Sequence, residues 1–258
     1  MPRKNYKYIY GPVPSWRLGS SLGVDPISGE KKICSFDCVY CQLGKTGVRT
    51  AKRRTFVPTE RIIEEIKSLP PLKIDYITFS GRGEPTLAGN LGEMIAGVKK
   101  IREEPVAVLT NASLMDRKDV RQDLSGADLV VAKLDAPSEE IFKKINRPVK
   151  GITLSKVVRG IKKFSKIHRG KLALQIMFTP GNRENAKELA RMARQIGADE
   201  VQLNTPLRPC PVKPLSRNEM SKIEKYFRGL NVVSVYGSMR KKVIPVSRKD
   251  TLRRRGKV

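Results

Sequence analysis

Three of the four cysteines of this 258-residue chain lie within eight residues, in the stretch CSFDCVYC at 34–41. Cys34 and Cys38 have three residues between them, and Cys38 and Cys41 have two. Thiolates bind zinc and iron, and they are also nucleophiles. Because disulfides are rare in reducing compartments, this crowding indicates metal ligands or a reactive thiol rather than a disulfide framework.

Three kinds of site use cysteines in this way. A structural zinc ion takes four tetrahedral ligands, so the distant Cys210 would have to supply the fourth. A catalytic thiol needs a single cysteine with a base nearby, which leaves the tight spacing unexplained. A 4Fe–4S cluster normally takes four thiolates, and three from one loop would leave one iron open to a substrate or cofactor. The spacing favours the cluster, and zinc stays the alternative.

The pattern C-x-x-x-C-x-x-C, with Tyr40 before the last cysteine, resembles the signature of the radical S-adenosylmethionine (radical SAM) superfamily. The stretch SGRGEPT resembles the Gly-Gly-Glu element of that family, with Arg82 standing where many members have other residues. The matching residues there are Gly83, Glu84 and Pro85. YGPVPSWRLGSSLGVDP, TNASL, KLDAPSEEIFKKINRP and QLNTPLRP resemble segments of a branch related to the wyosine tRNA-modifying enzymes. The resemblance covers roughly residues 8–210.

The resemblance implies a 4Fe–4S cluster on Cys34, Cys38 and Cys41, with S-adenosylmethionine on the open iron. Gly83 and Glu84, followed by Pro85, would receive the methionine ammonium group, since carboxylates and carbonyls accept from it. The other implied contacts are Tyr40 for the adenine, Lys133 for the carboxylate, Asp135 for the ribose hydroxyls, and Gln175, Met177, Asn204 and Thr205 for the ribose and adenine end. By residue type alone, Asp135 could instead cap the next helix, and Met177 could be a core residue.

The elements that position these residues alternate along the chain. Helical patterns over 58–69, 88–102, 116–124, 138–145, 153–167 and 183–196 separate apolar strands that end in polar or glycine residues. With a first strand near 20–33 this makes about six βα units, which is too few for a closed eight-fold barrel. We therefore predict an α/β fold, a partial (β/α)6 TIM-like barrel of parallel strands, with its active site at the C-terminal strand ends. A doubly wound open sheet also fits the alternation.

The chain is strongly basic, with 52 Lys and Arg against 25 Asp and Glu and a net charge of +27. Such a field attracts a polyanion, so nucleic acid, RNA above all, is the expected partner. Residues 1–238 are predicted to form the radical SAM core domain, and residues 239–258 a basic C-terminal tail. The absence of an apolar run of about 20 residues argues against a membrane protein. We expect a cytoplasmic monomer.

The function implied is reductive cleavage of S-adenosylmethionine, with electrons from a ferredoxin- or flavodoxin-type donor, to a 5′-deoxyadenosyl radical that abstracts hydrogen from a substrate. RNA or tRNA is the expected substrate, in an oxidoreductase- or transferase-type reaction. Wyosine enzymes of the radical type carry a second cluster, for which this chain has only Cys210 left, so a single-cluster relative is predicted. The alternatives are an activase or modifier of a protein or peptide, and a non-catalytic, zinc-stabilised RNA-binding protein.

Overall fold

The main sheet has eight strands in the order β1-β2-β5-β6-β7-β8-β9-β10. The structure is a computed structural model that describes residues 6–239 and 241–255. Only the β1–β2 pair is antiparallel, and every later neighbour is parallel. The strands are β1 (Ile9–Ser15), β2 (Gly19–Val24), β5 (Tyr76–Phe79), β6 (Val106–Thr110), β7 (Leu129–Lys133), β8 (Lys171–Met177), β9 (Glu200–Asn204) and β10 (Val232–Ser234). A separate two-stranded sheet pairs β3 (Ile33–Cys34) with β4 (Val48–Arg49).

The sheet is curled into a half-barrel, and the predicted partial barrel is confirmed. Strands β2, β5, β6, β7, β8 and β9 are the six parallel strands that the sequence pattern indicates. The hairpin strand β1 and the last strand β10 extend the sheet at its two edges, and the pattern did not predict them. Strand β1 was missed because Gly11, Pro12 and Pro14 obscure the strand signal of its sequence.

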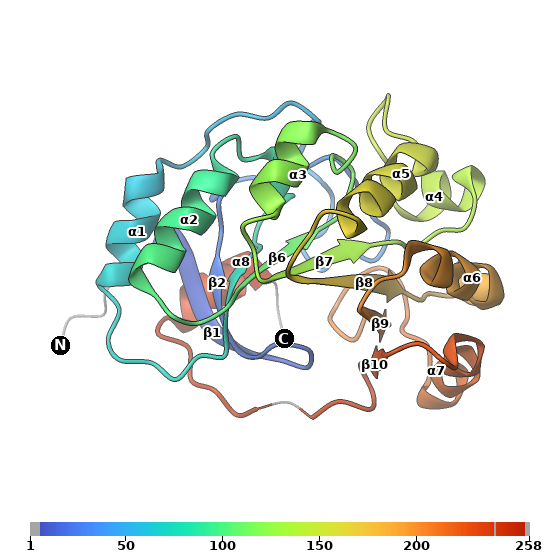
Figure 1. Ribbon diagram of the computed structural model, residues 1–258. Coiled ribbons are helices and arrows are strands. Elements are labelled where there is room, and N and C mark those ends of the chain that lie inside the picture. The colour runs from blue at the N-terminus through green and yellow to red at the C-terminus, as the bar shows by residue number, and fades with distance from the viewer. Residues whose placement is uncertain (1–5, 240, 256–258) are drawn as a thin grey trace.

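Helices cover the outer face of the sheet, as Figure 1 shows for α1 to α6. The helices are α1 (Thr59–Lys67), α2 (Leu91–Ile101), α3 (Lys118–Leu124), α4 (Glu139–Ile145), α5 (Leu154–Ser165), α6 (Ala186–Ile196), α7 (Arg217–Glu224) and α8 (Arg248–Arg255), with 3-10 turns η1 (Pro85–Leu87), η2 (Arg183–Asn185) and η3 (Lys225–Phe227). Helix α4 is capped by Ser138, whose hydroxyl accepts from the Ile141 N–H at 3.3 Å. Asp135 is therefore not the cap of that helix.

The two faces of the sheet bury different side chains, because successive residues of a strand point to opposite sides. One set, such as Val108 and Leu174, packs against the helices in the main core. The other set points into the curl, where Ala107, Val131 and Ala173 form a smaller cluster with Leu18 from the β1–β2 turn. Leu129 completes this cluster, so apolar side chains fill part of the concave side.

The basic segment predicted as a tail over 239–258 is described at 239 and 241–255. Helix α8 in this segment packs against β1, as Figure 1 shows. Gly11 N donates to Thr251 Oγ1 at 3.0 Å, and Arg254 Nε lies 3.5 Å from Asp25 Oδ2, with both charged side chains buried. Helix α8 is therefore packed against the domain, whereas Met239 and Ile244 in the stretch before it are exposed. Positions 240 and 256–258 lie outside the described residues.

Candidate cofactor site

The cysteine loop is fixed against the end of α4. Val39 N donates to the Ile145 carbonyl at 3.0 Å, and Thr46 Oγ1 donates to the Phe36 carbonyl at 2.8 Å. Phe36 is buried, and its ring meets Phe142 of α4 edge-on with centroids 5.3 Å apart. This aromatic contact holds the middle of the loop in the core, so that the flanking cysteines face the interior of the half-barrel.

A cavity of about 320 Å³ connects the cysteine loop with the carboxyl ends of the strands. Eleven of the thirteen residues predicted for the site line this cavity. They are Cys34, Cys38, Cys41, Tyr40, Gly83, Glu84, Lys133, Gln175, Met177, Asn204 and Thr205. The two exceptions are Pro85, which is buried in η1, and Asp135, which lies behind the lining. Residues from five separate parts of the chain thus meet in one place.

The thiols of the loop are partly buried and close to acidic groups. Burial, aided by Glu84, raises the pKa of Cys34 to about 12, and burial with Asp135 raises that of Cys38 to about 11. A thiol of this kind becomes a thiolate when a metal binds and displaces its proton. Within the described residues, no three His, Cys, Asp or Glu side chains are close enough to hold one metal ion. Thiolates of a cluster each bind a different iron and need not meet at one point.

The Glu84 carboxylate is buried at the end of the loop after β5. Its Oε1 accepts from Thr86 N at 3.1 Å, Thr86 Oγ1 at 2.7 Å and Thr110 Oγ1 at 2.6 Å. Its Oε2 accepts from Asn111 N at 2.7 Å, which leaves that oxygen with a lone pair for another donor. Burial raises the pKa of Glu84, and these hydrogen bonds oppose the increase. The arrangement suits an ammonium group arriving from the cavity.

Gly83 joins this carboxylate to the cysteine loop. Ile33 and Gly83 form a parallel bridge, and Glu84 N donates to the Ile33 carbonyl at 3.1 Å. A Cβ at position 83 would lie 1.9 Å from the Ile33 carbonyl oxygen, so only glycine fits. The resemblance to the Gly-Gly-Glu element therefore has a steric reason in this fold.

Asp135 orients its neighbours rather than lining the cavity. Its Oδ2 accepts from Tyr40 Oη in a short contact and from Asn146 Nδ2 at 2.8 Å, and its Oδ1 accepts from Met177 N at 2.8 Å. Lys133 Nζ is 3.6 Å from Oδ1 and 4.9 Å from the centre of the Tyr40 ring. Burial raises the pKa of Tyr40 well above its usual value, so this hydroxyl stays a donor.

Two asparagines that were not predicted for the site donate to the cysteine sulfurs. Asn111 Nδ2 is 3.5 Å from Cys34 Sγ, and Asn146 Nδ2 is 3.6 Å from Cys38 Sγ. Both stand in segments that carry the family resemblance, TNASL and KINRP, which was the available signal. The fourth cysteine, Cys210, does not line the cavity, and its Sγ donates to the Val212 carbonyl at 3.2 Å.

The sequence of this chain matches a known family over most of this architecture. Residues 32–196, which run from the start of the cysteine loop to the end of α6, match the Radical SAM superfamily. The chain belongs to the radical SAM superfamily. Its cofactors are a 4Fe–4S cluster and S-adenosylmethionine. The three thiols, the close approach of Gly83 to Ile33 and the lone pair left on Glu84 Oε2 fit these cofactors.

Close relatives share most of the chain. A UPF0026 protein of Synechocystis is 44% identical over 210 residues, which cover 81% of this chain and 78% of that protein. A probable GTP 3′,8-cyclase of Saccharolobus islandicus is 26% identical over 212 residues, covering 81% of this chain and 65% of the cyclase. The first of these relatives places the chain among the UPF0026 proteins, and the relation to wyosine tRNA-modifying enzymes stays a prediction.

Solved structures share the fold at low sequence identity. SuiB of Streptococcus suis bound to S-adenosylmethionine aligns with a TM-score of 0.62 and 16% identity over 80% of this chain and 48% of SuiB. This chain therefore spans about half the length of that structure. SuiB bound to precursor peptide SuiA aligns with a TM-score of 0.65. Among the described residues, no helix is long and apolar enough to cross a bilayer.

Proposed function

We propose that this chain is a single-cluster enzyme that starts a radical reaction on RNA, with tRNA as the leading substrate. The observation that carries the proposal is the cavity in which Cys34, Cys38, Cys41 and Glu84 meet, within a chain of net charge +27. Cys34, Cys38 and Cys41 would hold a cluster there, which would supply the electron for reductive cleavage of S-adenosylmethionine to methionine and a 5′-deoxyadenosyl radical able to take a hydrogen atom from the substrate.

The residues of this chain bind and orient the cofactor in the proposed site. Cys34, Cys38 and Cys41 are the iron ligands. The open lone pair of Glu84 Oε2 and carbonyls near Gly83 accept from the methionine ammonium, and Lys133 pairs with its carboxylate. Tyr40, Gln175, Met177, Asn204 and Thr205 surround the ribose and adenine. Asp135 acts indirectly, because its carboxylate holds Tyr40, Asn146 and Lys133 in position. Pro85 begins the 3-10 turn that follows Glu84.

Two observations support RNA as the substrate class. Lys and Arg outnumber Asp and Glu by 52 to 25, and phosphate contacts made by such residues supply affinity for nucleic acid. One relative is named for a reaction on GTP, which is itself a ribonucleotide. The proposal includes a ferredoxin- or flavodoxin-type electron donor, a monomeric state, a cytoplasmic location and an oxidoreductase- or transferase-type outcome.

The test is anaerobic reconstitution of the cluster, reduction, and incubation with S-adenosylmethionine, with and without total tRNA. We expect about four irons per chain, 5′-deoxyadenosine as a product, and faster formation when tRNA is present. An intact cluster that yields no 5′-deoxyadenosine under any condition would contradict the enzymatic part of the proposal. The matched control replaces Cys210 with serine, which should leave the iron content unchanged because Cys210 lies outside the cavity.

The two alternatives give different results in the same assay. A modifier of a protein or peptide, the class of molecule bound to SuiB in one solved structure, would form 5′-deoxyadenosine at a rate that tRNA does not change. A zinc-stabilised RNA-binding protein would retain zinc instead of iron, and the Cys210→Ser change would lower its metal content. Each outcome excludes the other two.

A further inference from the structure

The cysteine loop is held between two basic segments of the chain. On one side, β4 pairs with β3, and Arg49 lies opposite Cys34 in this parallel pair. On the other side, Asp37 N donates to the carbonyls of Asn146 and Arg147 at 3.0 and 3.2 Å. Each segment therefore lies directly against the loop that carries the proposed cluster ligands.

The two segments carry many positive charges and few negative ones. Residues 42–58 contain five Lys or Arg and no Asp or Glu, and residues 141–153 contain four Lys or Arg and again no acid. Five of their side chains are exposed and are called the loop patch below: Lys45, Arg49, Lys52, Arg147 and Lys150. The loop patch thus combines positive charge with access to solvent.

The side chain of Arg49 joins the two segments. Its Nη2 donates to the carbonyls of Arg147 and Pro148 at 2.7 and 3.0 Å. Arg147 has a φ of 47°, a left-handed conformation that few residues other than glycine adopt. Its carbonyl accepts from both Arg49 and the Asp37 N–H, so this conformation is fixed from two sides. The loop patch is therefore one continuous surface against the cysteine loop.

The positive charge of the loop patch is largely unbalanced. Within the described residues, none of its five side chains forms an ion pair with a carboxylate. The cysteine loop itself has one acid, Asp37. Burial raises the pKa of Asp37, but hydrogen bonds from Thr46 and the charges of Lys32 and Arg49 lower it overall, so this acid stays ionised. One carboxylate cannot balance five cations, and such a surface attracts an acidic partner.

The position of the loop patch separates it from the substrate. None of its five side chains lines the cavity, so a substrate bound there does not account for them. Neighbouring strands of a sheet lie about 4.8 Å apart, which puts Arg49 one strand away from the ligand Cys34. The rate of electron transfer falls steeply with distance, so an electron donor has to dock on a surface close to the cluster. The loop patch meets this requirement.

We propose that the loop patch is the docking surface of an acidic one-electron carrier protein. One electron passes from the reduced carrier to the cluster, so the carrier is oxidised and the cluster reduced by one electron, and no bond or proton changes place. Redox encounters of this kind are small and transient, and charges at their edge set the association rate. The inference rests on the proposed function, because it states where the electron donor of that enzyme binds.

The test removes the same charge at two different places. The patch triple combines Lys45→Gln, Lys52→Gln and Lys150→Gln, three exposed lysines outside the cavity. Its matched control removes three positive charges elsewhere, so that the two proteins have the same net charge and differ only in where the charge is lost.

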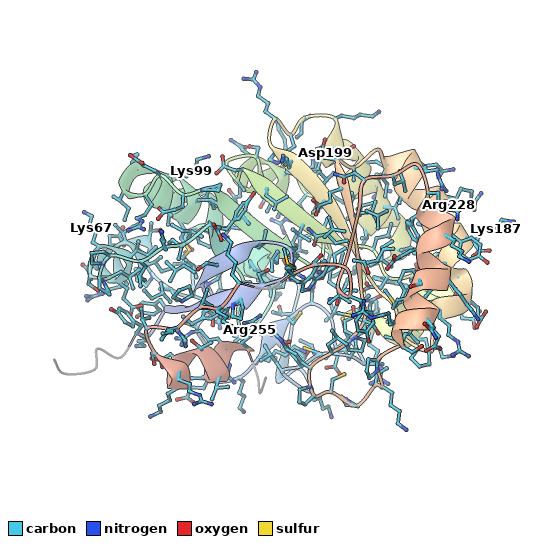
Figure 2. All side chains as sticks on the ribbon, turned by 90° about the horizontal axis from the view of Figure 1, so that it is seen from below. Lys67, Lys99, Lys187, Asp199, Arg228 and Arg255 are labelled. Atoms are coloured by element: carbon cyan, nitrogen blue, oxygen red, sulfur yellow. The ribbon has the colours of Figure 1, made fainter. Side chains whose placement is uncertain are left out.

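The control, called the far triple, combines Lys67→Gln, Lys100→Gln and Lys166→Gln. These lysines are exposed at the ends of α1, α2 and α5, which lead the chain back to the amino ends of the strands. Figure 2 shows Lys99, the neighbour of Lys100, and Asp199, which directly precedes β9, both on the upper side of the molecule. The cysteine loop belongs to the opposite, carboxyl ends of the strands.

The probes are an acidic flavodoxin reduced to its hydroquinone and, separately, a reduced acidic ferredoxin. Stopped-flow absorbance measures how fast each reduces the cluster-loaded protein. At low ionic strength we expect the patch triple to react at least about tenfold more slowly than the wild type, and the far triple within about twofold of it. Raising the ionic strength from about 0.1 to about 1 M shortens the range of attraction from about 10 to about 3 Å and should remove the difference.

Photoreduction with deazariboflavin, an uncharged small molecule that needs no docking surface, should reduce all three proteins equally and thereby show that their clusters are intact. Lys150→Gln alone should slow the reaction with the carrier about two- to threefold, which keeps the test valid if the patch triple fails to fold. Iron content and melting temperature monitor folding.

Equal rates for the patch triple and the far triple with both carriers would overturn the docking surface. Weaker tRNA binding by the patch triple with unchanged carrier rates would assign the surface to RNA and overturn the proposal as well. The proposed function fails separately: a wild-type protein that is photoreduced but forms no 5′-deoxyadenosine would contradict that function, whereas docking is read from the carrier rates.

Discussion

At the scale of single residues, the Glu84 carboxylate has a structural and a proposed binding role at once. Its Oε1 is saturated by Thr86 and Thr110, whereas Oε2 has room for one more donor. The Glu84→Gln change removes the negative charge. It also replaces one acceptor oxygen with an NH₂ group, which cannot accept from the surrounding donors of Thr86, Thr110 and Asn111. We expect S-adenosylmethionine to bind 10- to 100-fold more weakly to the cluster-loaded protein, measured by anaerobic equilibrium dialysis.

The control for this change is Glu188→Gln, at an exposed position of α6, which should bind S-adenosylmethionine normally. Iron content and melting temperature of both variants separate lost binding from lost folding. Unchanged S-adenosylmethionine affinity in a folded Glu84→Gln protein would show that the ammonium lies elsewhere.

Asn111 allows a second prediction at this scale. Its side-chain amide is 3.5 Å from Cys34 Sγ, and hydrogen bonds to ligand sulfurs help set the reduction potential of a cluster. An N–H donor stabilises the more negative, reduced form, so the Asn111→Ala change should make the midpoint potential more negative. A redox titration followed by electron paramagnetic resonance measures it, with Asn218→Ala on the surface of α7 as the control. An unchanged potential at full iron content would contradict the expectation.

At the scale of elements, the site depends on a contact between the loop after β5 and strand β3. Gly83 leaves no room for a side chain, because a Cβ would lie 1.9 Å from the Ile33 carbonyl. The Gly83→Ala change should push the loop away from the cysteines and lower the iron retained after reconstitution and desalting to less than half. At Gly89 an added Cβ comes no closer than 3.4 Å to other atoms, so Gly89→Ala should retain normal iron. Equal iron in both variants would show that the bridge is dispensable.

Helix α8 gives the second prediction at this scale. Arg254 and Asp25 form a buried ion pair at 3.5 Å, and Arg254 Nη2 also donates to the Lys7 carbonyl. Removing one partner of a buried pair leaves a buried charge, which typically costs about 3–5 kcal/mol. We expect Arg254→Met to lower the free energy of unfolding by about that amount in urea denaturation, and adding Asp25→Asn to restore part of it. A loss below about 1 kcal/mol would mean that α8 contributes little to the fold.

At the scale of the whole molecule, the net charge of +27 is the dominant feature. If the surface neutralises about 6–10 phosphates, tRNA affinity should fall about 10³- to 10⁵-fold between 50 and 200 mM salt. Filter binding across this range measures the slope, and binding of the uncharged ribonucleosides provides the salt-insensitive comparison. A flat salt dependence would remove the electrostatic argument for RNA.

Much of this architecture follows from local sequence pattern. The alternation of apolar runs and helical periods predicted the six parallel strands, because buried parallel strands and amphipathic helices leave repeating signatures. The sequence pattern did not predict the edge strands β1 and β10, since β1 contains glycine and proline and β10 is only three residues long. The packing of helix α8 was not predicted, because the residues that it contacts, in β1 and at Asp25, lie more than 200 positions away in the sequence.

Local patterns in the sequence indicate the chemistry of the centre, because three cysteines at gaps of three and two and the Gly83–Glu84 pair resemble the signature of one superfamily. The roles that depend on distance could be assigned only from the folded chain. It showed that Asp135 holds Tyr40 and Asn146 rather than lining the cavity, and that Asn111 reaches a cysteine sulfur. It also brought Arg17, Arg208 and Arg255 to the lining of one cavity, since packing across the half-barrel joins residues that no local pattern connects.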